Sequence, residues 1–335
     1  QYSLAVATQA VEDAKLETDK LNLDKIGVIF GVGIGGITTF EQEMTNYALN
    51  KELGPRFNPF FIPKMIADIA PGLISIKYGF RGVNFTTTSA CASSTNALVD
   101  AFNYIRLGKA DIILAGGSEA AVCEAGIGGF SSMHALSTRN DSPQTASRPY
   151  SKSRDGFVLG EGAGCLVLEE YEHAKARGAS ILAEVVGYGF SSNGLNISQP
   201  SAEGCITAIN RALKDASMKA DNIDYINAHA TSTPQGDAAE AVALDTIFAS
   251  HKTPISSTKS MTGHECWMAG ASEIVYSILM MKNDFIAPNI NFETPDEYSE
   301  NLNIIPSTCS RKLDVILSNS FGFGGTNSAL IIKKI

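Results

Sequence analysis

The sequence predicts an α/β protein built from two similar halves, and three observations lead to this fold class. Short apolar runs alternate with amphipathic stretches along all 335 residues, a pattern typical of strands and helices that alternate. After about residue 180 the same kinds of segment recur in the same order. No long charged or Pro/Ser-rich linker interrupts the chain. We therefore expect an internal duplication with halves 1–182 and 183–335, whose sheets fuse across a pseudo-twofold axis.

The first half begins with "KIGVIFGVG" (25–33), which predicts a buried strand ending in glycines, and "DIILAGGSE" (111–119) repeats that form. Between them, "NFTTTSACASSTNAL" (84–98) passes from strand character into apolar residues at helical spacing. This order predicts a βαβ unit with Cys91 at the junction of strand and helix. "CLVLEEYEHAKARG" (165–178) then predicts a strand followed by a helix that stops at glycine.

The second half repeats these elements with little residue identity. "DNIDYINAH" (221–229) resembles "DKIGVIFGV" (24–32), and "SSTKSMTGHECWMAG" (256–270) resembles the strand, polar turn and small-residue helix around Cys91. If the halves are duplicates, His264 occupies the position in the second half that Cys91 occupies in the first. Loops from matching ends of the two sheets would then bring both residues to one cleft.

Composition and charge exclude several classes of protein. A net charge of −9 argues against binding of nucleic acid, which requires basic groups to neutralise phosphates. No apolar run approaches the roughly 20 residues that span a bilayer. The chain begins at Gln1, so we expect the natural N-terminus to be missing, which leaves a targeting segment open. The cysteines have no metal-ligand spacing and predict free thiols in a reducing compartment: Cys91, Cys123, Cys165, Cys205, Cys266 and Cys309.

Cys91 has two interpretations. A helix N-terminus offers unpaired N–H groups and partial positive charge, which would lower the thiol pKa below its free value of about 8.5 and bind an oxyanion. The alternative is a small buried cysteine that only packs. Flanking Ser and Ala residues favour the nucleophile, because bulky core residues are missing around it.

The other polar candidate residues could also have purely structural roles. His229, in "NAHATSTPQGD", ends a buried strand and could be a capped core group, while Thr231 and Thr233 could form a turn or bind a ligand. Lys259 could be a surface charge. It stands, however, among small polar residues five positions before His264, where a solvated lysine is less expected.

The last candidate for the functional site is a glycine-rich loop. In "SNSFGFGGTNSALII" (318–332), three glycines alternate with Phe323 and allow backbone amides to approach a ligand closely. A phosphate cradle lacks the P-loop lysine, and "GVGIGG" (31–36) lacks the acidic residue of a dinucleotide site. A cysteine, two histidines, a lysine and this loop together indicate covalent acyl chemistry with a second substrate.

Five segments carry a resemblance to a known family. "TSACASS", "NAHATSTPQGD", "STKSMTGH", "NSFGFGGTNSALI" and "RPYSKSRDGFVLGEGAG" (148–164) resemble, in order and over the whole chain, the motifs of elongating β-ketoacyl-acyl-carrier-protein synthases of types I and II. The resemblance implies the thiolase-like fold, with two pseudo-duplicated βα halves in a five-layer α-β-α-β-α sandwich, and a homodimer. It also implies that an N-terminal segment carrying the first strand of half one is missing.

Carried over by motif, the resemblance implies a decarboxylative Claisen condensation in fatty-acid chain elongation. Cys91 would receive the acyl chain from acyl carrier protein (ACP), and the backbone amides of Cys91 and Phe323 would form the oxyanion hole. His229 and His264 would bind the malonyl thioester carbonyl and promote loss of carbon dioxide. The resulting carbanion would attack the acyl-Cys91 thioester.

Further roles follow from the same resemblance. Lys259 would hold the local hydrogen-bond network together with Glu273, and Thr231 and Thr233 would bind the phosphopantetheine arm of ACP. Phe323 would act as a gate. No metal or other cofactor is implied, and the compartment would be the cytoplasm, with an organelle left open. The remaining substrate contacts would come from Gly33, Ile34, Phe130, Phe157 and Phe321.

The chain departs from the family pattern beside the proposed site. Ala230 stands where glycine is usual, and His134 where a basic residue is usual. The run from Glu265 to Met268, with Trp267, replaces small residues after His264. These changes leave open a specialised ketosynthase of a polyene or secondary-lipid pathway. A non-elongating chain-length partner would replace the nucleophile, and a thiolase would carry a C-terminal cysteine-glycine motif. An acidic ACP would need a basic patch, for which the candidates are Arg56, Lys64 and Arg139.

Overall fold

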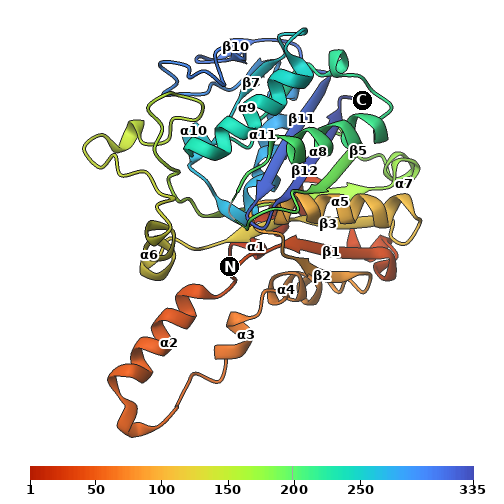
Figure 1. The fold of residues 1–335 in the computed structure, drawn as a ribbon. Coiled ribbons are helices and arrows are strands. Elements are labelled where there is room, and N and C mark those ends of the chain that lie inside the picture. The colour runs from red at the N-terminus through yellow and green to blue at the C-terminus, as the bar shows by residue number, and fades with distance from the viewer. Residues whose placement is uncertain (198) are drawn as a thin grey trace.

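The computed structural model describes residues 1–197 and 199–335. Two sheets form its framework (Figure 1). The first has four strands in the order β2 (Asn84–Thr87), β1 (Ile26–Gly31), β3 (Ile112–Glu119) and β4 (Gly162–Glu169). The second has six, in the order β5 (Glu184–Ser192), β12 (Thr326–Lys333), β11 (Val315–Gly322), β6 (Tyr225–Asn227), β7 (Pro254–Ser256) and β9 (Asn303–Ile304).

The predicted duplication is confirmed by the strand topology. In β2-β1-β3-β4 the first two pairs are parallel and the last is antiparallel. In β7-β6-β11-β12 the directions follow the same sequence. Strands β1 and β6 are the two that the sequence comparison matched, as are β2 and β7. The second sheet adds β9 at one edge and β5 at the other.

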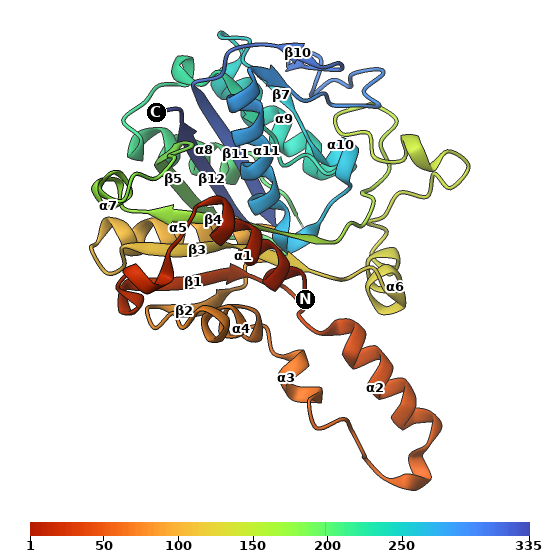
Figure 2. The same cartoon turned by 180° about the vertical axis from the view of Figure 1, so that it is seen from behind.

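Helices complete five layers (Figures 1 and 2). Between the sheets lie α5 (Ser93–Arg106) and α11 (Ala269–Asn283), packed in one apolar cluster with residues of both sheets. The outer face of the first sheet is covered by α1 (Tyr2–Asp13) and α4 (Ile69–Tyr78). The outer face of the second is covered by α8 (Ala202–Asp215) and α9 (Pro234–Phe248). The predicted α-β-α-β-α sandwich is therefore correct.

Successive side chains of each strand point to opposite faces of its sheet, which explains this layering. In β1, Ile26, Val28 and Phe30 pack in the outer cluster, whereas Ile29 packs between the sheets. In β11, Ile316 faces inward and Leu317 outward. Both faces of these strands are buried, which is why residues 26–30 and 315–317 show no alternation of apolar and polar side chains.

The remaining elements lie outside the layers. Helices α2 (Ile37–Leu49) and α3 (Phe61–Met65) project away from the body, as Figure 2 shows. The others are α6 (Glu124–Ser132), α7 (Tyr171–Ala176), α10 (Lys259–Thr262) and a two-stranded ribbon of β8 (Phe285–Ile286) and β10 (Cys309–Ser310). No helix of the described part of the chain is long and apolar enough to cross a membrane.

Candidate active site

Cys91 lies in the short turn between β2 and α5. The preceding residue, Ala90, has a φ of +49°, a conformation that costs energy for a residue with a side chain. Ser93 holds this turn, because its hydroxyl donates to the Ala90 carbonyl over 2.6 Å and accepts from the Ser89 amide over 2.9 Å. The strained turn fixes the sulfur at the start of the helix, as the sequence predicted.

The two halves meet at this sulfur. The Nε2 atom of His264 lies 3.1 Å from Cys91 Sγ, and the His229 and His264 rings are 5.4 Å apart, nearly perpendicular. One donor atom from each of the three residues lies within 4.8 Å of the others. Cys91 comes from the first half and both histidines come from the second, so the duplicated junctions share one cleft.

The backbone of His264 is itself fixed. Its amide donates to the Val158 carbonyl over 2.7 Å, and its carbonyl accepts from the Gly160 amide over 2.9 Å. This strand-like pairing ties the segment after α10 to the "RDGFVLGEG" stretch. These two backbone hydrogen bonds therefore hold the His264 imidazole against Cys91.

Burial dominates the chemistry of the thiol. Cys91 keeps some accessible surface, but the protein around its sulfur removes most of the water and raises its pKa to about 11. Lys259 and the amides of Phe323 and Cys91 oppose this rise without cancelling it. The expected pKa below 8.5 is wrong, because desolvation outweighs the helix N-terminus. The resting group is a neutral thiol.

The glycine-rich loop brings the second amide to the sulfur. A Cβ at Gly322 would lie 2.8 Å from the Ser89 carbonyl oxygen and 3.1 Å from the Cys91 nitrogen, so only glycine lets the two turns touch. The next residue is Phe323, whose amide hydrogen-bonds to Cys91. Its side chain is 40% exposed. The loop thus supplies one of the two N–H donors at the sulfur.

Both imidazoles are held neutral. The pKa values of His229 and His264 lie well below 6.5, mainly because burial penalises the charged ring and also because the Lys259 ammonium is close. Among the described residues, neither Nδ1 has a hydrogen-bond partner. The protein therefore fixes the charge of each ring but does not lock its tautomer.

Lys259 and Glu273 form a buried ion pair behind the histidines. Each is only 1% exposed, and Nζ donates to Oε1 of the carboxylate. Burial raises the pKa of Glu273 to about 7 even though the ammonium opposes the rise. The alternative interpretation of Lys259 as a surface charge is wrong. The positive charge of Lys259 instead lowers the pKa values of Cys91 and of both histidines.

Two carboxylates that the sequence analysis did not single out hold the turn after His229. Glu240 accepts from the amides of His229 and Ala230 over 2.9 and 2.7 Å. Asp237 accepts from the amides of Thr231 and Ser232. Both project from the first turns of α9 and are buried. An acidic residue three and six positions after Pro234 is the signal that could have revealed them.

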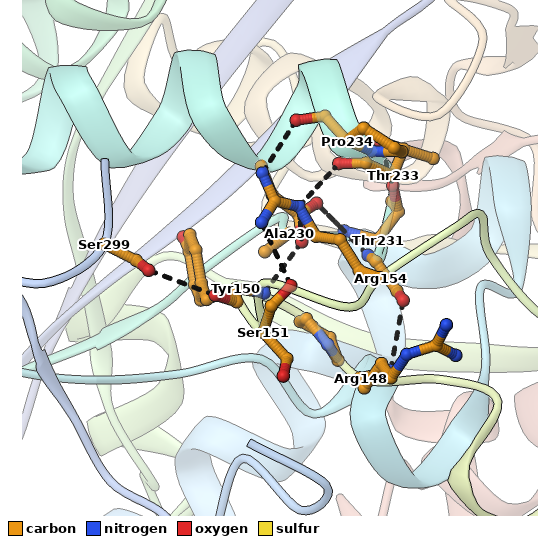
Figure 3. Close-up of polar contacts among 12 residues, drawn as sticks. Arg148, Tyr150, Ser151, Arg154, Ala230, Thr231, Thr233, Pro234 and Ser299 are labelled. Carbon is orange, nitrogen blue, oxygen red and sulfur yellow. Dashed lines mark hydrogen bonds and ion pairs between the residues drawn. The ribbon is translucent and has the colours of Figure 1, made fainter. Parts of the chain in front are cut away.

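A buried arginine ties this turn to the segment before β4 (Figure 3). Arg154 donates to the carbonyls of Thr233 and Pro234 over 3.2 and 2.8 Å, and to the Ser151 carbonyl over 3.1 Å. It also pairs with two carboxylates, Asp237 and Asp296, at 3.6 and 2.5 Å. The "RPYSKSRDGF" motif thus serves to position the loop that carries His229.

A cavity of about 420 Å³ opens above the sulfur. Thr231 and Thr233 line its wall, with their hydroxyls 3.0 Å apart. The predicted site residues that border it are Cys91, His229, His264, Thr231, Thr233, Phe130, Phe157, Phe321 and Phe323. Gly33 and Ile34 are not among the described residues that line the cavity. The Trp267 side chain packs against Gly33.

The remaining residues that the sequence analysis singled out lie in different environments. His134, with a φ of +53°, also lines the cavity. Arg56 and Lys64 are exposed in the projecting α2–α3 segment, while Arg139 is partly buried and donates to the Thr145 carbonyl. In the described part of the chain, Cys91, His229 and His264 are also the group close enough to hold a metal ion. A metal would occupy the sulfur lone pair that acyl transfer needs.

Comparison with known proteins agrees with this geometry. Residues 1–174 match the family model "Beta-ketoacyl synthase, N-terminal domain", and residues 182–293 match "Beta-ketoacyl synthase, C-terminal domain". The chain is 45% identical to 3-oxoacyl-[acyl-carrier-protein] synthase 2 of Coxiella burnetii, covering all of this chain and 81% of that protein. It is 44% identical to the mitochondrial 3-oxoacyl-[acyl-carrier-protein] synthase of Arabidopsis thaliana, covering 100% and 74%.

Solved structures give the same result. A β-ketoacyl synthase from Burkholderia phymatum superposes with a TM-score of 0.93 at 36% identity, covering all of this chain and 81% of that one. A chain from a complex between a type II polyketide acyl carrier protein and its ketosynthase bound to a hexaketide also scores 0.93, at 34% identity, with coverage of 100% and 84%.

Proposed function

The chain belongs to the β-ketoacyl synthase family, and from this premise we propose how its residues perform the elongating condensation. The protein is a 3-oxoacyl-ACP synthase of fatty-acid elongation, an acyltransferase that joins an acyl group to a malonyl-derived unit. One observation supports the proposed site above the others. A single sulfur, Cys91 Sγ, lies 3.1 Å from His264 Nε2, and the backbone amides of Phe323 and Cys91 are close enough to it to lower its pKa.

In the first half-reaction, the Cys91 thiol attacks the carbonyl carbon of the acyl-phosphopantetheine thioester. His264 Nε2 takes the thiol proton as the new S–C bond forms, because a thiol with a pKa of about 11 is rarely ionised at neutral pH. The amides of Phe323 and Cys91 stabilise the oxyanion. The pantetheine sulfur then leaves with the proton, and the acyl group remains on Cys91.

In the second half-reaction, malonyl-ACP loses carbon dioxide and the electron pair of the broken C–C bond becomes an enolate. His229 and His264 donate from Nε2–H to its oxygen, which neutral rings can do. His264 must therefore accept a proton in one step and donate in the next. An Nδ1 without a protein partner permits that change of tautomer. The enolate carbon then attacks the acyl thioester, and Cys91 leaves as thiolate and is reprotonated.

The buried ion pair sets the charge of the site. The ammonium of Lys259 disfavours an imidazolium at either histidine, so both rings stay neutral and His264 remains able to accept the thiol proton. Glu273 holds that ammonium in place. Removing one partner would leave a buried charge unpaired, which is strongly destabilising.

The partners follow from the reaction. ACP delivers both substrates, with Thr231 and Thr233 binding the phosphopantetheine arm, and a ketosynthase of the same fold has been solved with its carrier protein. The net charge of −9 requires a local basic patch, for which Arg56, Lys64 and Arg139 are candidates. Activity needs no metal or other cofactor, so prior dialysis against a chelator should leave it unchanged.

Oligomerisation, domain division and compartment complete the proposal. A homodimer is supported by β2, which is an edge strand of its sheet and offers a row of N–H and C=O groups for pairing. The duplicated units are residues 1–182, which carry β1–β4, and 183–335, which carry β5–β12. The six free cysteines support a reducing compartment, either the cytoplasm or an organelle.

Acyl transfer to one named cysteine tests the proposal. Incubation with acyl-ACP should place the acyl group on Cys91 alone, as peptide mass spectrometry can locate, and Cys91→Ala should remove it. Addition of malonyl-ACP should then release carbon dioxide and β-ketoacyl-ACP. An adduct on Cys266 instead, or condensation of acetyl-CoA without malonyl-ACP as in a thiolase, would contradict the assignment.

A further inference from the structure

A row of aromatic rings leads away from the catalytic imidazole along one wall of the cavity. From the catalytic imidazole, Phe157 lies 5.3 Å from the His264 ring, Phe130 lies 5.2 Å from Phe157, and the Trp267 indole lies 6.1 Å from Phe130. Phe157 and Phe130 border the cavity, whereas Trp267 packs against Phe130 and is not among the described residues that line the cavity. An acyl chain that extends from Cys91 past Phe130 would therefore meet the indole.

The indole fills its space up to the backbone of the opposite wall. A Cβ at Gly33 would lie 2.0 Å from an indole carbon, so the ring rests on a residue without a side chain. That backbone is fixed, because the buried Glu119 carboxylate accepts from the amides of Gly33 and Ile34 over 3.1 and 3.0 Å. The space between Phe130 and Gly33 is occupied by the Trp267 side chain.

The turn that carries the indole is anchored on both sides. Cys266 has a φ of +51° and is buried, as is Met268. The buried carboxylate of Glu265 accepts from the hydroxyl of Ser272 on α11. These contacts hold residues 266–268 as one rigid helical turn, and the indole is held with it.

We propose that Trp267 sets the acyl-chain length of this enzyme by closing the cavity beyond Phe130, so that short acyl chains are accepted and long ones are excluded. The proposal rests on the proposed function. The expected gain on removing the ring is substantial, since an engineered apolar cavity of about 150 Å³ holds a benzene molecule. Loss of the larger indole should let the acyl chain extend by roughly six carbon atoms. Burial of each added carbon should raise kcat/KM about fourfold.

The test compares wild type with Trp267→Ala on ACPs carrying hexanoyl, octanoyl, decanoyl and tetradecanoyl groups. In wild type, kcat/KM should fall steeply between the short and long chains. The variant should gain at least tenfold on tetradecanoyl-ACP relative to hexanoyl-ACP. Phe80→Ala removes a buried ring from the outer cluster and should leave this ratio unchanged. If wild type condenses acyl-ACPs but Trp267→Ala keeps the same profile, Trp267 is packing and the inference fails.

Other outcomes are also decisive. No condensation by wild type with any acyl-ACP would overturn the proposed function itself. If Trp267→Ala does not fold, intact-mass measurement of acyl transfer to wild-type Cys91 across the same panel still decides, because equal labelling by all four chains contradicts the inference. A second variant probes the geometry directly. Gly33→Ala should lower the melting temperature in wild type and much less in Trp267→Ala, where its Cβ finds space.

Discussion

At the scale of single residues, Cys91 combines a high pKa with a base in contact with it. Because burial raises the pKa to about 11, alkylation by iodoacetamide, which needs the thiolate, should accelerate about tenfold per pH unit above neutrality. The measurement is the rate of Cys91 modification by mass spectrometry, with Cys91→Ser as the background. A plateau near pH 8 would mean that the thiolate is already the resting form.

Lys259 gives a second prediction, on the histidines. In wild type, the rate of acyl transfer to Cys91 should stay constant as pH falls through 6.5, because His264 must be neutral to take the thiol proton and its pKa lies well below that value. Removing the ammonium raises the pKa values of both histidines, so the His264 imidazolium, which cannot accept the thiol proton, forms at higher pH and acyl transfer slows there. The variant is Lys259→Met combined with Glu273→Leu, which leaves no unpaired buried charge.

The rate of acyl-Cys91 formation from acyl-ACP, followed by intact mass across the acidic range, checks this sign. The acidic limb should move toward 6.5 in the double variant and lie well below it in wild type. An acidic limb that does not move would show that the ammonium does not control the rings. Thermal melting at pH 8 is the control for folding.

The sequence predicted that Cys91 and His264 share one cleft, because the duplication places them at equivalent junctions, and the structure brings them into contact. The thiol pKa was predicted with the wrong sign, since the number of protein atoms around a sulfur depends on the packing of both halves. Glu240 and Asp237 were missed for a related reason. Whether a carboxylate in the first turns of a helix faces a neighbouring loop depends on the direction of that helix.

At the scale of elements, the loop after β6 depends on one buried cation. Arg154 is 5% exposed at its side chain and pairs with Asp237 and Asp296. Arg154→Met leaves both carboxylates without their cation, so we expect a loss of about 3–5 kcal/mol in the free energy of unfolding. Urea denaturation measures it. The activity should fall as well, because the same arginine holds Thr233 and Pro234.

A matched control exists on the surface. Arg81 pairs with Asp24, and both side chains are well exposed, so Arg81→Met should leave the urea midpoint unchanged. Equal midpoints for Arg154→Met and wild type would show that the buried pair contributes nothing net to this loop.

The element pattern was predictable where strands are buried on both faces. The weak match between 24–32 and 221–229 still found equivalent strands, because each has buried apolar residues on both faces: Ile29 and Phe30 in one, Tyr225 and Ile226 in the other. The projection of helices α2 and α3 away from the body had no such signal in the sequence. Neither helix has a fully buried residue, so no periodic pattern facing a core marks their position.

At the scale of the whole molecule, the segment from α2 to α4 in the first half has an unusually apolar surface. Residues of α2, α3, α4 and the connecting loop expose large side chains: Phe40, Leu49, Leu53, Phe60, Ile62, Ile66, Leu73 and Ile76. This segment adjoins β2, the open edge of the four-stranded sheet, which packs against α4. Large exposed apolar patches on soluble proteins mark interaction sites, and a second copy pairing at β2 would cover both features.

Charge on these side chains should therefore break the homodimer that we propose. Ile76→Asp combined with Ile62→Asp places two carboxylates where apolar contact is expected, at side chains that are 78% and 62% exposed in one chain. Light scattering after size exclusion should give twice 35.5 kDa for wild type and one chain mass for the variant. Leu107→Asp, which is 72% exposed at the end of α5, should remain dimeric. A wild-type monomer at all concentrations would contradict the homodimer, and would leave the apolar surface to a different partner.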